Sequence, residues 1–484
     1  VTGAHEPHVV AQRDVGADRE RPRGRAAEVR ADAHGHQHLF PGDGNEAVAF
    51  ALCGRARRSD LELLVVHDVV PIPHEVCRVR TPHNVAWPGV AMEPVLERAA
   101  ARGLAVVKVH SHPTGYEWFS TTDDVAEREM FPSVFAWLDT DAPLASLIML
   151  PDGRLVGRAV LEGGGGQPLD GIRVVGDDFQ FFQYGHEMSE GVVPDHALRV
   201  AQTFGERTYQ LLRRLRIGVV GASGTGSIVI EQLARNCVGE LVVVDPDAVE
   251  DKNLNRILNS TAMDAADRAN KAKVQARAVS AMQLGTRVHT FGTDLLDRGV
   301  IEALSTCDVL FGCMDSVDGR HVLNKLASTY VIPLIDIGVR LDADGNGGID
   351  SIWLAVHTVQ PGGSSLLSRR VYSQEDLQAA FLRRTDPRAY EQQRKLGYVK
   401  GVMVDRPAVI SVNMEAASAA VNEFLARVHP YRVAPNGRFA VRRICLSDPE
   451  ASEALGDGEP CRAMARVVGL GDEEPLLGLP MLGR

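Results

Sequence analysis

Two histidines and an aspartate have a spacing that suits a catalytic metal ion. His110 and His112 lie at the end of an apolar run, 105–109, and Asp123 follows eleven residues after the second histidine. Residues i and i+2 of a strand share a face, so both imidazoles leave the strand on the same side. Two imidazoles and one carboxylate leave the fourth position of zinc to water, as in catalytic sites. The alternative is that the histidines are ordinary polar strand residues and that Asp123 or Thr121 caps the following helix.

A water molecule activated by zinc would also need a base to accept its proton and a donor beside the developing oxyanion. Glu46 and Ser120 are the candidates. Glu46 opens the apolar strand expected over 47–52, and Ser120 lies three residues before Asp123. Both side chains are therefore expected in the pocket of the metal site.

These five residues resemble the signature of the JAB/MPN (JAMM) metalloproteases. The segment reads His-x-His, seven residues, Ser, two residues, Asp, and a glutamate precedes an upstream apolar strand. The resemblance covers roughly residues 38 to 160. It implies that His110, His112 and Asp123 hold Zn²⁺, that Glu46 is the general base, and that Ser120 stabilises the tetrahedral intermediate.

A glycine-rich loop supplies a second candidate site. Residues 221–226 read Gly-Ala-Ser-Gly-Thr-Gly, after a buried strand and before a helix, so backbone N–H groups and the helix N-terminus can bind phosphate. Asp245 ends the next apolar strand, where an acidic residue binds the ribose hydroxyls in dinucleotide-binding folds. Taken alone, this pattern also fits an NAD-dependent oxidoreductase.

Charged residues downstream favour adenylation of a carboxylate over hydride transfer. Asn253 and Arg256 close the polar run that begins at Asp245, and Lys273 and Asp315 follow. Adenylation needs cations that neutralise the triphosphate as pyrophosphate leaves, and a carboxylate that holds Mg²⁺. Hydride transfer needs neither.

The segment from about 196 to 430 resembles the ThiF/MoeB and ubiquitin-activating enzyme superfamily. The resemblance implies ATP and Mg²⁺ as ligands, with Arg256, Lys273 and Asp315 in catalysis. It also implies a binding role for each motif residue: Gly221, Gly224 and Gly226 line the phosphate loop, Asp245 binds ribose, Asn253, Arg256 and Lys273 contact the phosphates, and Asp315 binds magnesium. Lys271 competes with Lys273 for the phosphate role, and we favour Lys273. Arg199 matches an arginine that in relatives reaches the ATP of a partner subunit, which indicates a homodimer.

The chain departs from these relatives where they carry paired Cys-x-x-Cys motifs for structural zinc. Residues 361–368 read Pro-Gly-Gly-Ser-Ser-Leu-Leu-Ser, with serines where thiolates would lie, and the C-terminal counterpart is Cys461-Arg-Ala-Met. Neutral hydroxyls are poor zinc ligands, so we predict no structural zinc there. Some activating enzymes carry a thioester cysteine in the same region, and Cys445 and Cys461 remain the candidates here.

Composition is that of a globular protein with two or three domains. Apolar residues make up 45% and charged residues 24% of the 484 residues, which allows sizeable cores. The net charge of −11 argues against nucleic acid as the main partner, because phosphate binding needs clustered Lys and Arg. Seven scattered cysteines indicate a reducing cytoplasm, and we find no leader pattern or long apolar run that would indicate secretion or membrane insertion.

Five segments are expected along the chain. Strand–helix alternation from 217 to 336 predicts an α/β fold with a Rossmann-like, mostly parallel sheet and helices on both faces. The run Gly163–Gly166 indicates a domain boundary or a long surface loop. The expected segments are a disordered extension over 1–36, a JAB/MPN-like α+β domain over 37–165, a linker over 166–195, a ThiF-like adenylyltransferase domain over 196–435, and a C-terminal tail with a degenerate zinc motif over 436–484.

Together the two resemblances imply one substrate for both domains. The first domain would cleave a peptide or isopeptide bond after the terminal glycine of a ubiquitin-like or sulfur-carrier protein, and the second would adenylate that glycine. The expected partner is a carrier that ends in Gly-Gly. Two other functions fit the sequence: a nucleotide-sensing or scaffolding module with degenerate sites, and a natural-product enzyme that adenylates a peptide.

Overall fold

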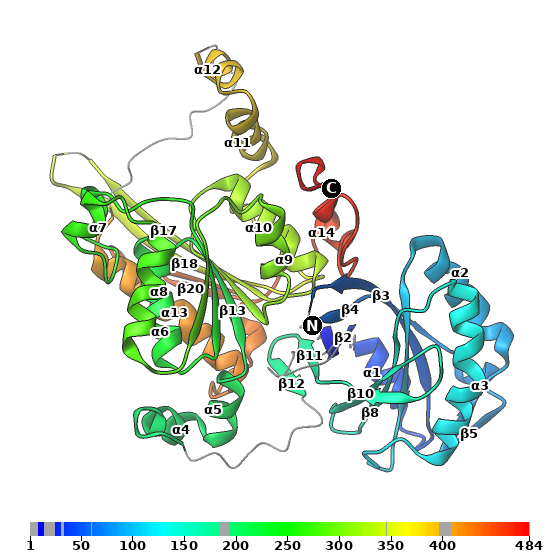
Figure 1. Ribbon diagram of the computed structural model, residues 1–484. Helices are drawn as coiled ribbons and strands as arrows, with labels where there is room; N and C mark the ends of the chain where they lie inside the picture. The colour runs from blue at the N-terminus through cyan, green and yellow to red at the C-terminus, as the bar shows by residue number, and fades with distance from the viewer. Residues whose placement is uncertain are drawn as a thin grey trace. The chain divides into compact units, whose positions relative to one another are not determined.

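The chain divides into two compact units (Figure 1). The computed structural model describes residues 8–13, 25–30, 33–59, 61–182, 193–344, 346–395 and 408–483. The first unit contains Val1–Glu190, Thr329–Val331 and Val467–Gly478, and the second contains Gly191–Ser328, Ile332–Arg466 and Leu479–Arg484. Among the described residues, no helix has the length and apolar character needed to cross a membrane.

The first unit is built on a mixed ten-stranded sheet, in the order β10-β9-β8-β7-β3-β4-β1-β2-β11-β12. β7 and β8 are parallel, and β3 pairs antiparallel with β4 and β7. The strands are β1 His8–Arg13, β2 Arg25–Arg30, β3 Val48–Arg57, β4 Glu62–Pro71, β7 Ala105–Ser111, β8 Leu144–Met149, β9 Leu155–Val160, β10 Gly166–Pro168, β11 Gly171–Val175 and β12 Phe179–Phe182. A separate hairpin is formed by β5 (Val79–Thr81) and β6 (Asn84–Ala86).

Helices α1 (Ala33–Leu39), α2 (Glu93–Arg102) and α3 (Thr121–Leu138) accompany this sheet. α2 and α3 pack against each other, and α2 also packs on β3 and β7. Every residue of β7 is buried, because its run of Ala and Val has neighbours on both faces. α2 ends at Gly103, whose φ of 62° is the left-handed conformation that commonly ends helices. The well-packed centre of the sheet therefore carries the ends of β3 and β7, where Glu46 and His110 lie.

The structure differs from the expected boundaries of this unit in two places. The run Gly163–Gly166 does not start a linker: Gly164 and Gly165, with φ of 83° and 93°, form the turn between β9 and β10. Glycine adopts such angles without strain, so a glycine run suits a tight turn as well as a linker. Residues 166–182 then add three strands to the sheet. At the N-terminus, β1 and β2 lie within 1–36, the segment expected to be disordered, and β1 gains its backbone hydrogen bonds from β4 and β11.

The second unit contains an eight-stranded sheet in the order β15-β14-β13-β16-β17-β18-β19-β20. The five strands from β15 to β17 are parallel, and the last three are added antiparallel. The strands are β13 Arg216–Val220, β14 Glu240–Val244, β15 Arg287–Phe291, β16 Val309–Gly312, β17 Leu334–Ala343, β18 Ile349–Val359, β19 Val441–Cys445 and β20 Glu453–Leu455. The chain proceeds from β13 to one side and later returns to β16 on the other, so the strand order reverses between them. This is the Rossmann-like arrangement, and the predicted fold class is confirmed.

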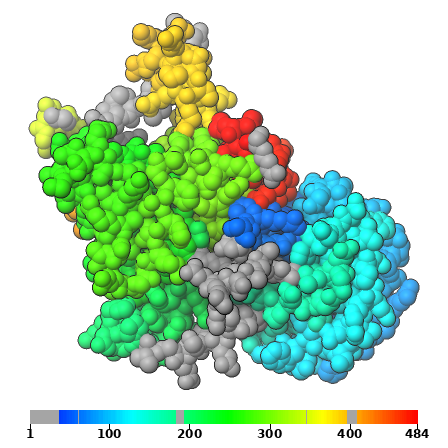
Figure 2. Space-filling model, in the orientation of Figure 1, coloured from blue at the N-terminus to red at the C-terminus, as the bar shows by residue number. Residues whose placement is uncertain are grey.

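Helices cover both faces of this second sheet (Figure 1). On one face α13 (Ile410–Val428) packs on α6 (Gly224–Arg235), which contacts α8 (Lys271–Met282). α9 (Arg298–Leu304) and α10 (Val317–Thr329) lie on the other face. The remaining helices are α4 Leu198–Phe204, α5 Glu206–Leu212, α7 Ala262–Ala266, α11 Gln374–Thr385, α12 Pro387–Lys395 and α14 Arg462–Ala465. Figure 2 shows α11 and α12, in yellow, standing out from the body of this unit.

Gly205, whose φ of 82° and ψ of 153° are not helical, separates α4 from α5. One expectation for this unit also differs from the structure. The expected C-terminal tail, 436–484, contributes β19 and β20 to the second sheet, because β19 pairs with β18 over five residues. Residues Val467–Gly478 belong to the first unit.

A fully buried ion pair fixes α13 to the segment that follows it. Glu423 and Arg427 lie one helical turn apart with side chains 0% exposed, and Arg427 Nε is 2.9 Å from Glu423 Oε1. Arg432 binds Glu423 Oε2 at 2.5 Å. Arg427 also donates to the backbone carbonyls of Asn436 and Phe439. Because burial removes water from these charges, each depends on its partner.

We therefore expect Glu423→Gln to destabilise the second unit. The substitution keeps the size of the side chain but leaves the buried Arg427 guanidinium without its counter-charge, at a cost of about 3–5 kcal/mol. Urea unfolding followed by circular dichroism should show a lower midpoint. The control is Glu453→Gln, which removes an exposed partner of Arg443 and should cost less than about 1 kcal/mol. Equal shifts in the two variants would contradict this account.

Candidate functional site

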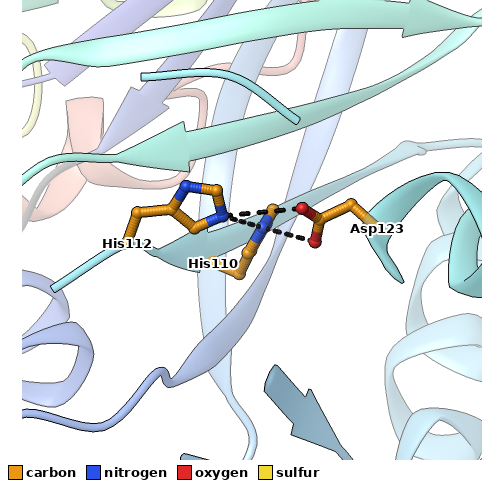
Figure 3. A group of neighbouring side chains, drawn as sticks. All are labelled: His110, His112 and Asp123. Carbon is orange, nitrogen blue, oxygen red and sulfur yellow. Dashed lines mark hydrogen bonds and ion pairs between the residues drawn. The ribbon is translucent and has the colours of Figure 1, made fainter. Parts of the chain in front are cut away.

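The two histidines and the aspartate meet at one point in the first unit (Figure 3). β7 carries His110 at its buried end, His112 lies directly beyond the strand, and Asp123 lies in the first turn of α3. His110 Nε2 is 2.9 Å from Asp123 Oδ1, and His112 Nε2 is 3.6 Å from Asp123 Oδ2. The two Nε2 atoms are 3.1 Å apart. Ligand atoms of all three residues lie within 4.8 Å of one another, a spacing that one ion with bonds of about 2 Å can bridge.

Neighbouring groups orient the carboxylate and one of the imidazoles. Ser120 is the N-cap of α3 and forms a capping box with Asp123: Ser120 Oγ and N donate to Asp123 Oδ2 at 2.6 Å and 2.8 Å. The cap is therefore Ser120, not Asp123 or Thr121. His112 Nδ1 donates to the Tyr116 carbonyl at 2.7 Å, which leaves Nε2 to bind a metal.

The electrostatics of the group suit a divalent ion. Burial lowers the pKa of His110 to about 4, so this imidazole is neutral at pH 7. Burial alone would raise the pKa of Asp123, but hydrogen bonds from His110, His112 and Ser120 hold it well below its usual range. Burial likewise opposes the charged form of His112, while the hydrogen bonds with Asp123 and the Tyr116 carbonyl raise its pKa. A metal ion would displace such a proton, and two nitrogens with one carboxylate fit the ligand preference of zinc.

Glu46 and Ser120 line one cavity together with His112. The cavity has a volume of about 420 Å³, and its other lining residues are His83, Thr114, Gly115 and Tyr116. Glu46 lies two residues before Val48, where the pairing of β3 with β7 begins, and its Oε1 lies 3.8 Å from His112 Nε2. Burial raises the pKa of Glu46 to about 7. A carboxylate with this pKa can accept and return a proton near neutral pH, as a general base must.

Sequence reasoning did not identify His83 as a residue of this cavity. His83 lies in the turn between β5 and β6, and backbone contacts hold the hairpin against Glu46. Glu46 N donates to the Thr81 carbonyl at 2.9 Å, and Arg80 Nε donates to the Glu46 carbonyl at 3.0 Å. These contacts join residues more than thirty positions apart, so no local sequence pattern predicts them.

The glycine-rich loop of the second unit brings backbone close to backbone. Gly221 follows β13 with a φ of +95°, and a Cβ there would lie 2.7 Å from the Cys313 carbonyl oxygen. A Cβ on Gly226 would lie 1.8 Å from the Gly221 oxygen, and one on Gly224 would lie 2.4 Å from Asn413 Nδ2. α6 begins at Gly224, so its first N–H groups face this loop. The geometry is that of an anion-binding loop at a helix N-terminus.

Asp245 fixes the loop from the end of β14. Its Oδ2 accepts from Ala222 N at 2.7 Å, and its Oδ1 accepts from Asp247 N at 2.9 Å. Burial raises the pKa of this carboxyl group. The carboxylate thus shapes the loop itself, and its role toward ribose stays a prediction.

Arg256 approaches the loop, whereas Asn253 supports the turn that carries it. A Cβ on Gly224 would lie 3.3 Å from Arg256 Cδ. The Arg256 guanidinium donates to the Lys252 carbonyl at 2.7 Å and to Asn255 Oδ1 at 3.0 Å. Asn253 is buried, and its Oδ1 accepts from Glu250 N at 3.1 Å. The aliphatic part of Arg256 therefore lies beside the loop, and its role toward a phosphate stays a prediction.

The two candidate lysines differ in their surroundings. Lys271 opens α8, its side chain is 9% exposed, and its Nζ lies 2.8 Å from Asp247 Oδ2. Lys273 is exposed in the same first turn and has no ion-pair partner within the described part of the chain. Lys271 already neutralises a carboxylate, so the geometry favours Lys273 for the phosphate role, which stays a prediction.

Asp315 and Arg199 occupy different parts of the second unit. Asp315 follows β16, the parallel neighbour of β13, so it leaves the same edge of the sheet as the glycine loop. Arg199 lies exposed on α4, and its guanidinium donates to Gln202 Oε1 at 3.1 Å. The structure thus brings Asp315 toward the loop, while the hydrogen bonds of Arg199 to other described residues lie within its own helix.

Ionic contacts join the two segments for which the sequence predicts no structural zinc. Arg369 Nε donates to Ser364 Oγ at 2.7 Å, and Arg369 also lies 2.8 Å from Asp457 Oδ1. Ser364 Oγ donates to the same carboxylate. Close by, Cys461 N donates to the Gly363 carbonyl at 2.9 Å. A guanidinium, a carboxylate and a hydroxyl thus link residues about ninety positions apart in the sequence.

Fold and geometry together define a protein with a candidate metal site in one α/β unit and a nucleotide-binding fold in the other. Residues 29–154 match the prokaryotic homologs of the JAB domain, and residues 196–431 match the ThiF family. The chain therefore joins a JAB-type domain to a ThiF-family domain, and the resemblance found in the sequence is confirmed.

Similar proteins match part of the chain. A "Ubiquitin-like modifier-activating enzyme 5" of Culex quinquefasciatus is 26% identical over 175 residues, which are 32% of this chain and 43% of that protein. A "Sulfur carrier protein adenylyltransferase" of Thermus thermophilus is 29% identical over 140 residues, 29% of this chain and 51% of that protein. The chain thus spans about half or less of these relatives. A crystal structure of E. coli MccB with succinimide has a TM-score of 0.43 and 15% identity, and the match covers 59% of this chain and 76% of that chain.

We expect Gly226→Ala to weaken nucleotide binding. The new Cβ would overlap the Gly221 oxygen, so the loop must move. Overpacking of this kind costs about 1–3 kcal/mol, which corresponds to roughly 5- to 150-fold in affinity. Titration with a fluorescent ATP analogue measures the change. Gly163→Ala is the control, because a Cβ there has open space around it and should leave affinity unchanged.

Proposed function

We propose that the ThiF-family domain uses ATP to adenylate the C-terminal carboxylate of a ubiquitin-like or sulfur-carrier protein. The observation that carries the proposal is the glycine loop at the point where strand order reverses, with Arg256 beside Gly224 and Asp315 after the neighbouring strand. The names of two similar proteins, a sulfur carrier protein adenylyltransferase and a modifier-activating enzyme, support this substrate class.

Each group at the loop has a role in this reaction. The carboxylate oxygen of the carrier forms a bond to the α-phosphorus of ATP, and pyrophosphate leaves. N–H groups of the loop and of the first turn of α6 would hold the phosphates. Arg256 and Lys273 would neutralise charge that develops on the departing pyrophosphate, and Asp315 would hold Mg²⁺. Asp245 would bind ribose while it fixes the loop through Ala222.

We further propose that the JAB-type domain hydrolyses the bond after the terminal glycine of the same carrier. The supporting observation is the convergence of the His110, His112 and Asp123 ligand atoms beside a cavity that Glu46 lines. Zn²⁺ would supply Lewis acidity there. Glu46 would take a proton from the attacking water and return it to the leaving amine. Ser120 Oγ donates to Asp123, so it would have to turn toward the cavity to stabilise the oxyanion.

Hydrolysis and adenylation suit one chain because hydrolysis would produce the carboxylate that adenylation uses. Hydrolysis after the terminal glycine exposes a free carboxylate, and adenylation requires one. Joining both sites in one polypeptide raises the effective concentration of the product of the first near the second. Arg199, exposed on α4, would serve the second subunit of a homodimer.

For hydrolysis, we expect the zinc-loaded protein to cleave a carrier extended beyond Gly-Gly. Glu46→Gln should lower the rate by about 10²- to 10⁴-fold, because the amide cannot accept the proton. Chelation of zinc should abolish cleavage, and added Zn²⁺ should restore it. Glu75→Gln changes an exposed carboxylate outside the cavity lining and should retain the wild-type rate. Mass spectrometry of the products measures cleavage, and activity in Glu46→Gln equal to wild type would refute the role of Glu46.

For adenylation, we expect carrier-dependent exchange of labelled pyrophosphate into ATP. Asp315→Ala should reduce exchange by about 10²-fold or more, since a site for transition-state charge neutralisation is lost. Asp350→Ala, in an exposed part of β18, is the matched control. Exchange that persists without any carrier, or that survives in Asp315→Ala, would argue against this assignment.

A further inference from the structure

A buried cluster of charges lies one helical turn from the metal ligands. Glu127 on α3 holds three side chains: Lys108 Nζ is 3.2 Å from Oε1, Ser146 Oγ donates to Oε1 at 2.5 Å, and Arg158 donates to Oε2 at 2.9 Å and 2.6 Å. Lys108, Ser146 and Glu127 are all 5% exposed or less. None of these residues has a part in the proposed hydrolysis.

The three partners of Glu127 form one row across the sheet. Lys108 on β7 lies opposite Ser146 on β8, and Ser146 lies opposite Arg158 on β9. Residues in register on neighbouring strands point to the same face, so the row presents an ammonium group, a hydroxyl and a guanidinium to one point above the sheet. The Glu127 carboxylate on α3 accepts hydrogen bonds from all three groups.

This row is the neighbour of the row that carries the metal ligands. His110 lies two residues after Lys108 on β7, and Glu127 lies four residues after Asp123 on α3, so each pair shares a face. Two strand residues span about 6.6 Å, and four helical residues span about 6 Å. The Asp123–His110 and Glu127–Lys108 contacts are therefore two matching cross-links between the same helix and the same strand. If α3 slides or rotates enough to break the Glu127–Lys108 contact, it also displaces Asp123 from His110.

Arg158 adds a tie to the start of α3. Its NH1 lies 2.6 Å from Asp124 Oδ1, and its guanidinium carbon lies 3.9 Å from the ring centre of Phe119. These two residues flank the segment 120–123, which contains the cap and the metal-binding carboxylate. In addition, His110 Nδ1 is buried and has no hydrogen-bond partner among the described residues. The ring of His110 thus lacks the usual outer contact, and its alignment depends on where the facing carboxylate lies.

We propose that Glu127 is a positioning residue of the metal centre. By binding Lys108, Ser146 and Arg158 on three successive strands, it sets the height and rotation of α3 so that Asp123 faces His110. The inference rests on the proposed function only in that the site must bind a metal ion.

The test is metal affinity in the full-length chain, measured by the absorption of bound Co²⁺ and by competition of Zn²⁺ with a chromophoric chelator. Glu127→Ala should weaken binding by about 10- to 100-fold, the usual effect of losing a group that orders metal ligands. The double variant Lys108→Met, Glu127→Gln restores side-chain length and charge balance and should recover most of the loss. Ser146→Ala, which keeps all charges, should give a smaller loss in the same direction.

Glu62→Ala is the matched control for general destabilisation. Glu62 is also a buried carboxylate that binds two arginines, Arg55 and Arg57. Glu62 pairs with Arg57 at one end of β3, and His110 pairs with Val48 at the other end. At about 3.3 Å per residue, Arg57 and Val48 are roughly 30 Å apart. Glu62→Ala should lower the melting temperature but leave metal affinity unchanged.

Several outcomes would overturn the proposal. These are wild-type affinity in a folded Glu127→Ala variant, an equal loss in Glu62→Ala, or no recovery in the folded double variant. If Glu127→Ala does not fold, unchanged affinity in Ser146→Ala would overturn it. Failure of the wild-type chain to bind either metal would instead refute the proposed hydrolytic site.

Discussion

The first domain depends on the contacts of the Asp123 carboxylate, which binds both His110 and Ser120. One of its oxygens lies against His110, and the other accepts hydrogen bonds from Ser120 at the start of α3. The same group therefore satisfies the helix terminus and completes the set of ligand atoms. A side chain with both duties has little rotational freedom, so the helix and the ligand geometry are fixed together.

In the second domain the corresponding constraint is steric. The turns around the glycine-rich loop leave no room for a Cβ at Gly221, Gly224 or Gly226. This lets one backbone segment lie directly on another, and Asp245 secures the arrangement through Ala222 N. The charged groups expected to act on a triphosphate then come from separate strands and helices that end at the same edge. Close backbone packing and convergent strand ends together account for the position of this site.

The residues that sequence reasoning located best are those whose spacing is local. His110, His112 and Asp123 fall within fourteen residues, and the strand period places both histidines on one face. Glu46 and Asp315 were candidates by residue type, but their roles came from resemblance, because their approach depends on pairing between strands far apart in sequence. Glu127, Ser146 and Arg158 were not found, since a row across three strands has no signature in any single segment. The glycine run at 163–166 was misjudged because glycine permits both a tight turn and a linker.

The ionic junction around Arg369 has a consequence for how the second domain responds to its surroundings. Ser364 and Asp457 contact this guanidinium in the region for which the sequence predicts no structural zinc. Neither a guanidinium nor a hydroxyl can be oxidised to a disulfide, and neither gives up an ion to a chelator. The junction should therefore keep its contacts under oxidative stress and in the presence of a chelator. Under the proposed function, removal of zinc would empty the site of His110, His112 and Asp123, while the ionic junction around Arg369 would stay in place.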